Sequence, residues 1–361
     1  MTMDRRAPRH LRVAAIAGAF GLLLAACGDN GDDEADGDDG EATGGESMTL
    51  SYAFFAPEAS FPAVQMQEWA DRMAEETDGQ VDVDLFPGGT LLEAGNIYDG
   101  VASGVADVGI DAPVYDVGRF PVLSVMSLPL DFPNARVASH TMLDLLEEYE
   151  PDELDGFQIV TAFTSEPAYL QTTLPVEGRD DLAGVELRTT GAGVSFMEAL
   201  GASPVAMPMS DVPEAMQTGV VEGYLTSREV LEDFGLAEQV SHMTDYAFGL
   251  AGTFVAVMEQ DAFDALPEDI QQAIHDLRPE MTGFASTYHD EENVASSLEF
   301  AEDEDVETIE LDADETAAWD EALEPIVDDW VQTATDNGLP AQEILDRTLE
   351  LRDQYIEEFG E

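Results

Sequence analysis

Residues Gly184–Arg228 read GVELRTTGAGVSFMEALGASPVAMPMSDVPEAMQTGVVEGYLTSR, the pattern of one α/β unit. Gly184–Thr189 is expected to form a short strand, with two apolar residues on one face and Arg188 on the other. Residues 191–193 (Gly-Ala-Gly) allow a tight turn, and Ser195–Leu200 is expected to be a helix that a glycine ends. The segment therefore predicts a strand, a turn and a helix, with a basic side chain near their junction.

This junction has the chemistry of an anion site. The first turn of a helix offers N–H groups without partners and the positive end of the helix dipole, so an anion beside Arg188 would be stabilised twice. The alternative is an ordinary turn in which Arg188 is only a surface charge. The segment by itself leaves both interpretations open.

The composition is that of a soluble globular protein with an unusually acidic balance. The chain has 361 residues, enough for two lobes with a core each, and 44% of them are hydrophobic. It has 13 Lys+Arg, all of them arginine, against 78 Asp+Glu, for a net charge of −65. Nucleic acid and anionic lipid both need clustered positive charge, so neither is expected to be a binding partner of this surface.

The scarcity of basic residues makes each arginine informative. Four of the 13 lie within the first twelve residues, which leaves nine for the rest of the chain. Surface carboxylates can neutralise most of these charges. An arginine flanked by an apolar strand and a glycine-rich turn, as Arg188 is, is harder to explain in that way.

The N-terminus has the pattern of an export signal. Four arginines precede an apolar run from Val13 to Ala26, whose 14 residues are too few for a stable membrane span and suit a signal peptide. The run ends in Leu24-Ala25-Ala26-Cys27, which resembles the lipobox of bacterial-type lipoproteins. We therefore expect a signal peptide over 1–26 and a lipid anchor on Cys27, the only cysteine.

Residues 27–47 are expected to be an acidic, disordered tether, because after Cys27 they contain no large apolar residue. Their acidic residues do not have the spacing of a calcium-binding EF-hand loop, since the twelfth position counted from Asp32 is Thr43 and not glutamate. No metal site is expected here.

The folded part is expected to begin near Met48 and to alternate strands with helices, as a mostly parallel α/β sheet does. The expected strands are Thr49–Phe55, Val81–Phe86, Val105–Asp111 and Val255–Met258. The expected helices are Phe61–Asp78, Leu91–Ser103, Asp261–Leu266, Pro267–Tyr288, Ala313–Asn337 and Gln342–Phe359.

One step of this pattern occurs twice. Ile97–Asp111 and Val212–Thr226 each contain a helix that ends at a glycine, then an acidic residue and a buried strand. This indicates two similarly built lobes and places Asp111 and Thr226 at equivalent strand ends. Because ligands of open α/β sheets bind beyond the carboxyl ends of strands, both residues are expected to face a cleft between the lobes. The alternative is that two unrelated units share the same turn chemistry.

Motifs of catalysis and cofactor binding are missing from the sequence. It contains no G-x-S-x-G elbow, no P-loop and no H-E-x-x-H, and Phe196 stands where a dinucleotide-binding loop needs its third glycine. The four histidines beyond the leader are isolated from one another and from cysteine. We expect a binding protein without a cofactor and not an enzyme.

Several stretches resemble the solute receptors of tripartite ATP-independent (TRAP) transporters, the DctP-like family. The central ones are GVELRT, ALGASPVAMPMSDV and AMQTGVVEG, all within residues 184–223. LFPGGTL (85–91), SGVAD (103–107), LPL (128–130) and ALPEDIQ (265–271) add to the resemblance, which covers essentially everything after Met48.

The resemblance implies an α/β, two-lobed, periplasmic-binding-protein-like (Venus flytrap) fold with long helices that span both lobes. Lobe I is expected to contain residues 48–168 and 254–294, and lobe II residues 169–253 and 295–361. Such a receptor works outside the cytoplasm, closes on an organic acid and docks on a sodium-driven permease with one small and one large membrane subunit.

The resemblance also implies ligand-binding residues. The family's carboxylate-clamping arginine falls on Arg188, and the aromatic residue that packs under the ligand falls on Met209. Thr226 takes the place of the ligand-binding asparagine, in a run where Tyr224 also departs from the family pattern. Leu170 stands where receptors of sugar acids have a second arginine.

Lobe I is expected to contribute Phe54 and Asp111 to the ligand site. Arg228 is either a second positive contact or only the start of the next helix. Because several positions are less polar than in receptors of sugar acids, we expect a monocarboxylate with an apolar or aromatic body.

Three further classes of protein share parts of this pattern. A binding protein of an ATP-driven importer shares the lobes and the lipid anchor but not the central run. The remaining two classes are extracellular sensors and secreted hydrolases.

The acidic surface predicts a dependence of stability on salt. At 1 M salt the Debye length is about 3 Å, so the repulsion among the carboxylates is screened. We expect the melting temperature to rise between low and molar NaCl, measured by circular dichroism. A melting temperature that does not rise would contradict the idea of a protein adapted to concentrated salt.

Overall fold

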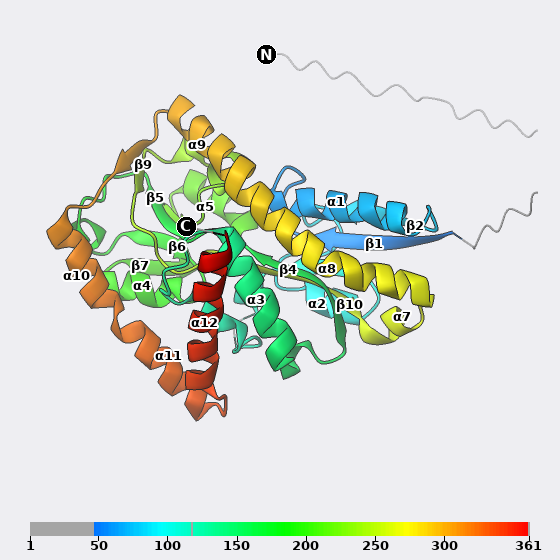
Figure 1. The fold of residues 1–361 in the computed structure, drawn as a ribbon. Coiled ribbons are helices and arrows are strands. Elements are labelled where there is room, and N and C mark those ends of the chain that lie inside the picture. Colours follow the sequence, from blue (N-terminus) through cyan, green and yellow to red (C-terminus); the bar gives the residue numbers. More distant parts are fainter. Residues whose placement is uncertain (1–46, 117, 360–361) are drawn as a thin grey trace, which may run out of the picture. The chain divides into compact units, whose positions relative to one another are not determined.

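Two β-sheets organise the computed structural model, which describes residues 47–116 and 118–359 (Figure 1). The described residues belong to one compact unit. The predictions for the leader 1–26, for Cys27 and for the tether up to residue 46 lie outside the described residues.

The first sheet has the strand order β2-β1-β3-β10-β4. Its strands are β1 (Met48–Phe54), β2 (Val81–Phe86), β3 (Val108–Asp111), β4 (Phe157–Thr164) and β10 (Thr253–Glu259). β1 is parallel to β2 and β3, whereas β10 runs antiparallel between β3 and β4. The late strand β10 therefore inserts between two strands that precede it by about a hundred residues or more.

The second sheet has the order β11-β9-β5-β8-β6-β7. Its strands are β5 (Tyr169–Thr172), β6 (Glu186–Thr189), β7 (Ser203–Ala206), β8 (Gly223–Thr226), β9 (His242–Thr244) and β11 (Glu307–Ile309). β6 is parallel to β7 and β8, and β5 runs antiparallel to β8 and β9. Arg188 thus lies on a strand with neighbours on both sides.

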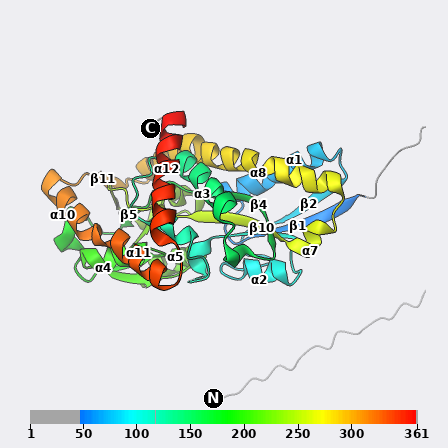
Figure 2. The ribbon, with the colours of Figure 1, turned by 60° about the horizontal axis from the view of Figure 1, so that its bottom comes forward.

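Helices cover both sheets. They are α1 (Phe61–Glu76), α2 (Ile97–Ala102), α3 (Ala135–Tyr149), α4 (Gly193–Leu200), α5 (Val212–Thr218), α6 (Val230–Asp233), α7 (Gln260–Asp264), α8 (Glu268–Tyr288), α9 (Val294–Asp303), α10 (Ala313–Leu323), α11 (Pro325–Asp336) and α12 (Ala341–Phe359). α8 packs on β4, α1 and α3, and in the second view it runs between α1 and α3, above β4 (Figure 2).

The repeated step predicted from the sequence is present in both sheets. α2 is followed by Gly104 (φ 72°) and β3, and α5 is followed by Gly219 (φ 70°) and β8. Left-handed backbone of this kind favours glycine, which is why the same residue ends both helices. Asp111 and Thr226 are the last residues of the two strands, as expected.

Two expected elements differ from those observed. The helix expected at Leu91–Ser103 is reduced to α2, because Gly95 adopts φ 76° in a turn before it. The helix expected at Ala313–Asn337 is divided into α10 and α11, with Pro325 as the first residue of the second helix. Proline has no N–H to continue a helix, and it suits a first helical position.

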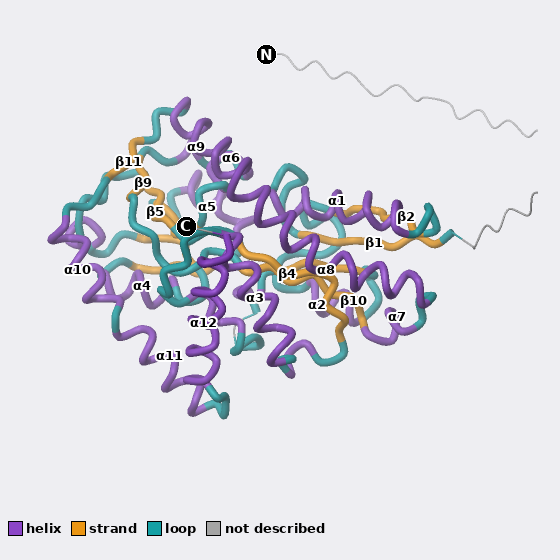
Figure 3. The backbone as a smooth tube through the Cα atoms, viewed as in Figure 1, coloured by secondary structure: helices purple, strands orange, loops and turns teal. Residues whose placement is uncertain are grey.

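The chain passes between the two sheets at three places. The segments 165–168 and 245–252 connect β4 to β5 and β9 to β10, and they pair through the bridge Pro167–Leu250. A π-helical turn, His289–Asn293, joins α8 to α9, which follow one another in Figure 3. α8 packs on elements of the first sheet, and α9 packs on α6 beyond β8.

Large apolar side chains fill the core. Trp69 on α1 and Trp319 on α10 are fully buried, in two separate hydrophobic clusters.

None of the helices in the described part of the chain combines the length and the apolar character that a bilayer span requires.

The crossover 245–252 fits tightly against the loop before α3. A Cβ atom on Gly249 would lie 2.1 Å from the carbonyl oxygen of Ser127. We expect Gly249→Ala to lower the free energy of unfolding by about 1–3 kcal/mol, because backbone cannot yield as a side chain does. Urea denaturation at fixed salt measures the change.

The matched control is Gly283→Ala inside α8, where a Cβ atom would meet nothing closer than His140 Nε2 at 3.9 Å. There alanine should stabilise by about 0.5–1 kcal/mol, because glycine is a poor helix former. Equal effects of the two substitutions would contradict the tight fit at Gly249.

Candidate functional site

A small cavity of about 40 Å³ lies where elements of both sheets meet. On the side of the first sheet, the lining residues come from β1, from the start of α1 and from the 3-10 turn Pro113–Tyr115. The ends of β6 and β8 contribute residues from the second. Apolar side chains form most of the wall: Phe54, Phe55, Phe61, Pro62, Val114, Met209, Val230, Phe234 and Phe254.

Arg188 contributes the positive charge of this cavity. It is 2% exposed and is the one buried arginine among the described residues. Its Nε donates to the carbonyl oxygen of Met207 at 3.0 Å. Burial lowers the pKa of Arg188 from its ordinary value, and the nearby Tyr115 opposes this. The ordinary value is so high that the guanidinium keeps its charge.

Arg188 lacks the acidic partner that most of the described arginines have. Six of the nine arginines in residues 47–359 have a carboxylate oxygen within 4.0 Å. Arg188 has none among the described residues, although the chain contains 78 Asp+Glu. A buried charge without a counter-ion costs free energy, so the surroundings of Arg188 are suited to an anion from outside.

Four of the predicted site residues meet in this cavity: Arg188, Met209, Thr226 and Phe54. Sequence reasoning missed Tyr115, whose hydroxyl accepts a hydrogen bond from the backbone N–H of Met209 at 3.1 Å. This bond connects the turn after β3 to the second sheet. The sequence offered a partial indication of Tyr115, because this residue follows Asp111, at the end of a predicted strand, by only four residues.

The structure does not bring the other four predicted residues to the cavity wall. The carboxylate of Asp111 accepts hydrogen bonds from the backbone N–H groups of Gly95 and Ile97, at the turn into α2, and from that of the next residue, Ala112. Burial raises the pKa of Asp111 to about 7. Asp111 therefore connects the end of β3 to the turn before α2.

Leu170 and Tyr224 lie inside the second sheet. Leu170 is fully buried in a hydrophobic cluster, and Tyr224 is a register partner of Arg188 across β6 and β8. Tyr224 thus lies beside Arg188 in the sheet, Leu170 lies on the far side of β8, and neither residue lines the cavity.

Arg228 forms an ion pair with Glu166. Its Nε and Nη2 donate to the two carboxylate oxygens of Glu166 at 2.8 and 2.5 Å, and its guanidinium lies 4.1 Å from the ring centroid of Tyr169. It is therefore engaged on the crossover between the sheets, and α6 begins two residues later, at Val230.

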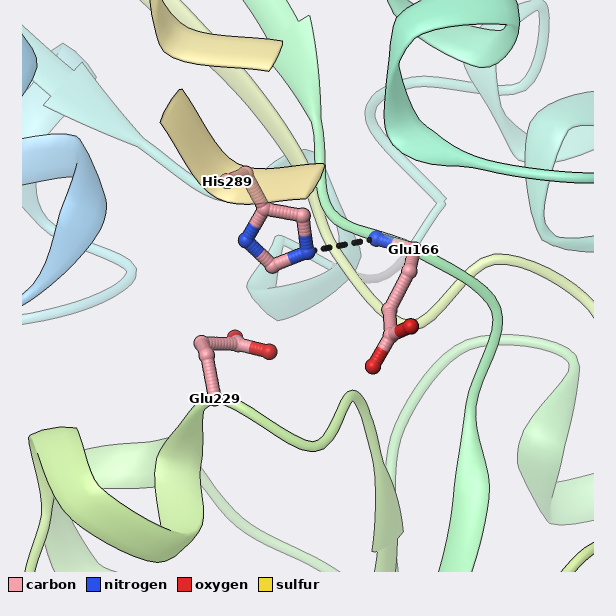
Figure 4. A group of neighbouring side chains, drawn as sticks. All are labelled: Glu166, Glu229 and His289. Carbon is pink, nitrogen blue, oxygen red and sulfur yellow. Dashed lines mark hydrogen bonds between the residues drawn. The ribbon is translucent and has the colours of Figure 1, made fainter. Parts of the chain in front are cut away.

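Glu166, Glu229 and His289 form a cluster that the sequence did not reveal (Figure 4). One ligand atom of each lies within 4.8 Å of the others, which is close enough for a metal ion. His289 Nε2, however, accepts a hydrogen bond from the backbone N–H of Glu166 at 3.0 Å. When one ring nitrogen of a histidine binds a metal, the other donates a hydrogen bond, whereas Nε2 of His289 accepts one. The carboxylate oxygens of Glu166 already accept hydrogen bonds from Arg228. The cluster does not fit a metal site.

Comparison with known proteins agrees with this architecture. The family model described as bacterial extracellular solute-binding protein, family 7, matches residues 53–333. The C4-dicarboxylate-binding periplasmic protein DctP of Rhodobacter capsulatus is 27% identical over 289 residues, 75% of this chain and 81% of that protein.

Solved structures include a TRAP periplasmic solute-binding protein from Desulfovibrio salexigens. It is 37% identical, with a TM-score of 0.76 over 87% of this chain and 98% of that one. A marine metagenome TRAP protein specific for aromatic acids, solved with 3-hydroxybenzoate, is 23% identical with a TM-score of 0.81 over 86% and 99%. The predicted two-lobed α/β fold is confirmed by these structures.

Proteins of this kind bind small organic acids outside the cytoplasm and work with membrane permease subunits. Family and fold are those of binding proteins and not of enzymes, as the sequence predicted. The chain therefore belongs to family 7 of the bacterial extracellular solute-binding proteins, as the extracytoplasmic receptor of a TRAP transporter.

Proposed function

We propose that this receptor captures a small monocarboxylate with an apolar or aromatic body. The observation that carries the proposal is the buried guanidinium of Arg188, which has no carboxylate partner among the described residues and lines a mostly apolar cavity. A carboxylate fits the planar fork of a guanidinium with two parallel hydrogen bonds. The ligand would thus supply the counter-ion that the protein does not.

The wall around Arg188 favours one negative charge on the ligand. Arg188 is the one basic residue among the described residues that line the cavity, and the same wall also carries Glu229 and Asp233. A second carboxylate on the ligand would be desolvated without a cation, which is costly. This argues against a dicarboxylate, although DctP of Rhodobacter capsulatus is named for C4-dicarboxylates.

The rest of the wall suits an aromatic or aliphatic body. Phe54 and Phe61 each pack edge to face against Phe254, which leaves rigid apolar surface beside the cavity. Met209 adds a surface that adapts to the shape of the ligand, and Thr226 brings a hydroxyl group. Structures of similar fold hold 3-hydroxybenzoate, benzoate and mandelate, which supports this class of ligand.

Capture would close two lobes on the ligand. The lobes proposed are 48–168 with 254–294, and 169–253 with 295–361, so that Phe54 comes from one and Arg188 from the other. A ligand that contacts both lobes shifts the population toward the closed state. The closed receptor would then dock on a sodium-driven permease with one small and one large membrane subunit, while a lipid on Cys27 holds it at the membrane.

Arg188→Ala should weaken binding of benzoate by about 100-fold or more, because two charge-assisted hydrogen bonds are lost at about 1.5–3 kcal/mol each. Arg188→Lys should recover only part of the loss, since an ammonium group lacks the planar fork. Isothermal titration calorimetry in high salt gives the Kd values.

Arg179→Ala is the matched control, because Arg179 is exposed and also lies beside the second sheet. It should bind like the unchanged protein. All variants should keep nearly the same melting temperature, since no described carboxylate depends on Arg188. Tight binding that survives in Arg188→Ala would show that the site is elsewhere.

The net charge predicts an unusual salt dependence of the association rate. An anionic ligand approaches a chain of charge −65, and the repulsion is screened as the Debye length falls from about 10 Å at 0.1 M to about 3 Å at 1 M salt. The association rate constant should therefore rise with NaCl in stopped-flow fluorescence. A rate that falls with salt, at constant circular dichroism, would contradict this.

A further inference from the structure

The cavity beside Arg188 is too small for a whole ligand of the proposed class. Its volume of about 40 Å³ is room for about three water molecules, since one water needs about 10–15 Å³ on the same measure. An apolar cavity that binds benzene has about 150 Å³. The cavity therefore accommodates a carboxylate group on Arg188 and little of the body attached to it.

A larger cavity of about 620 Å³, here called the outer cavity, adjoins the first. Val114 and Thr190 line both cavities, and Thr190 follows Arg188 by two residues. The volume of the outer cavity lies within the range of about 300–1,000 Å³ that is usual for small-molecule sites. Together the two cavities form a space that begins at the guanidinium and widens away from it.

Both sides of the molecule contribute to the outer cavity. The turn Pro113–Tyr115 and the 3-10 segment Leu123–Ser127 lie on one side, and the start of α4 and the helix α11 lie on the other. Most of the lining side chains are apolar: Pro113, Val114, Phe120, Leu123, Leu128, Ala192, Val194, Ile326 and Trp330. Burial of apolar ligand surface against such a wall stabilises a complex.

Trp330 on α11 has its polar group satisfied within the protein. Its Nε1 donates a hydrogen bond to the hydroxyl of Ser124 at 2.8 Å, and this bond joins the two sides of the outer cavity. The hydroxyl of Ser124 in turn donates to the carbonyl oxygen of Pro121 at 2.6 Å. The indole ring therefore contributes a large apolar surface to the wall and needs no polar partner from a ligand.

The charges of the outer cavity do not favour a second anionic group on the ligand. Its charged lining residues among those described are Asp116 and Asp329, and none of them is basic. Asp116 is already paired with Arg119 at 3.0 Å, and Asp329 is exposed to solvent. A carboxylate in the outer cavity would meet negative charge and no basic partner, whereas an uncharged body would not be repelled.

We propose that the outer cavity holds the body of the ligand while Arg188 holds its carboxylate. The ligand class is then the monocarboxylates with an extended apolar body, longer than benzoate, such as phenylalkanoates. This rests on the proposed function, because it takes the carboxylate on Arg188 as given. It adds the length of the ligand, which the wall of the outer cavity selects.

The test compares benzoate with 3-phenylpropionate and 5-phenylpentanoate by isothermal titration calorimetry in high salt. Each acid has two more CH₂ groups than the one before it. A buried CH₂ group strengthens binding by about fourfold, and the ordering of the chain offsets part of this gain. The unchanged protein should therefore bind 5-phenylpentanoate about 10-fold or more tightly than benzoate.

Ser195→Trp fills the outer cavity, because Ser195 is an exposed residue of its wall at the start of α4. The ratio of the affinities for 5-phenylpentanoate and benzoate should fall close to one. Ser203→Trp is the matched control, since Ser203 is exposed on β7 and lines neither of the two cavities. It should keep the ratio of the unchanged protein.

Ala206→Trp is a second filling variant, at another exposed position in the wall of the outer cavity. It decides if Ser195→Trp does not fold or binds none of the acids.

The outcomes separate the two proposals. Affinities that stay equal or fall as the acid lengthens, or a preference for the long acid that persists in the deciding variant, would overturn the role of the outer cavity and leave the monocarboxylate proposal standing. A preference that is lost in Ser203→Trp as well would also overturn it. Failure of the folded, unchanged protein to bind any of the three acids would overturn both proposals. A preference that is lost only in the filling variant supports the role.

Discussion

The burial of one positive charge is the constraint around which the proposed ligand site is built. In a chain of net charge −65, Arg188 lies 2% exposed on a strand with a neighbour on either side and has no carboxylate partner among the described residues. Desolvating a guanidinium costs free energy that its hydrogen bond to Met207 only partly offsets. The fold tolerates this cost because the strand register fixes Arg188 at the meeting of both sheets, where an anionic ligand can compensate.

A polar network connects the three places where the chain passes between the sheets. Glu166 lies on one crossover and pairs with Arg228 beyond β8, while its backbone N–H contacts His289 in the π-helical turn. The same turn holds the start of α3, because Asp290 accepts hydrogen bonds from the first two N–H groups of that helix. Directional contacts of this kind define one geometry more sharply than apolar packing does, so the network fixes how the crossover segments lie against one another.

The sequence predicted the elements and part of the site because those features are local. Periodicity and glycine positions were sufficient for both βα steps, and therefore for Thr226 at a strand end. Arg188 was identifiable because a basic residue on an apolar strand is unusual. The role expected of Asp111 was different from the one observed, since its carboxylate finds backbone donors in a loop whose path no periodicity describes. Glu229 was invisible for the same reason, because its burial depends on segments far apart in the chain.

Protonation gives an acidic protein a way to form an anion site. The wall that faces Arg188 also contains Asp233 and Glu229, which as carboxylates would repel the ligand. Burial raises the pKa of Asp233 to about 7 and that of Glu229 well above its usual range, so both groups hold their protons to higher pH than exposed carboxyl groups do. Desolvation thus acts in opposite directions on the two kinds of group. It leaves the guanidinium charged, because the ordinary pKa of arginine is far above neutrality, and it favours the neutral form of the carboxyl groups.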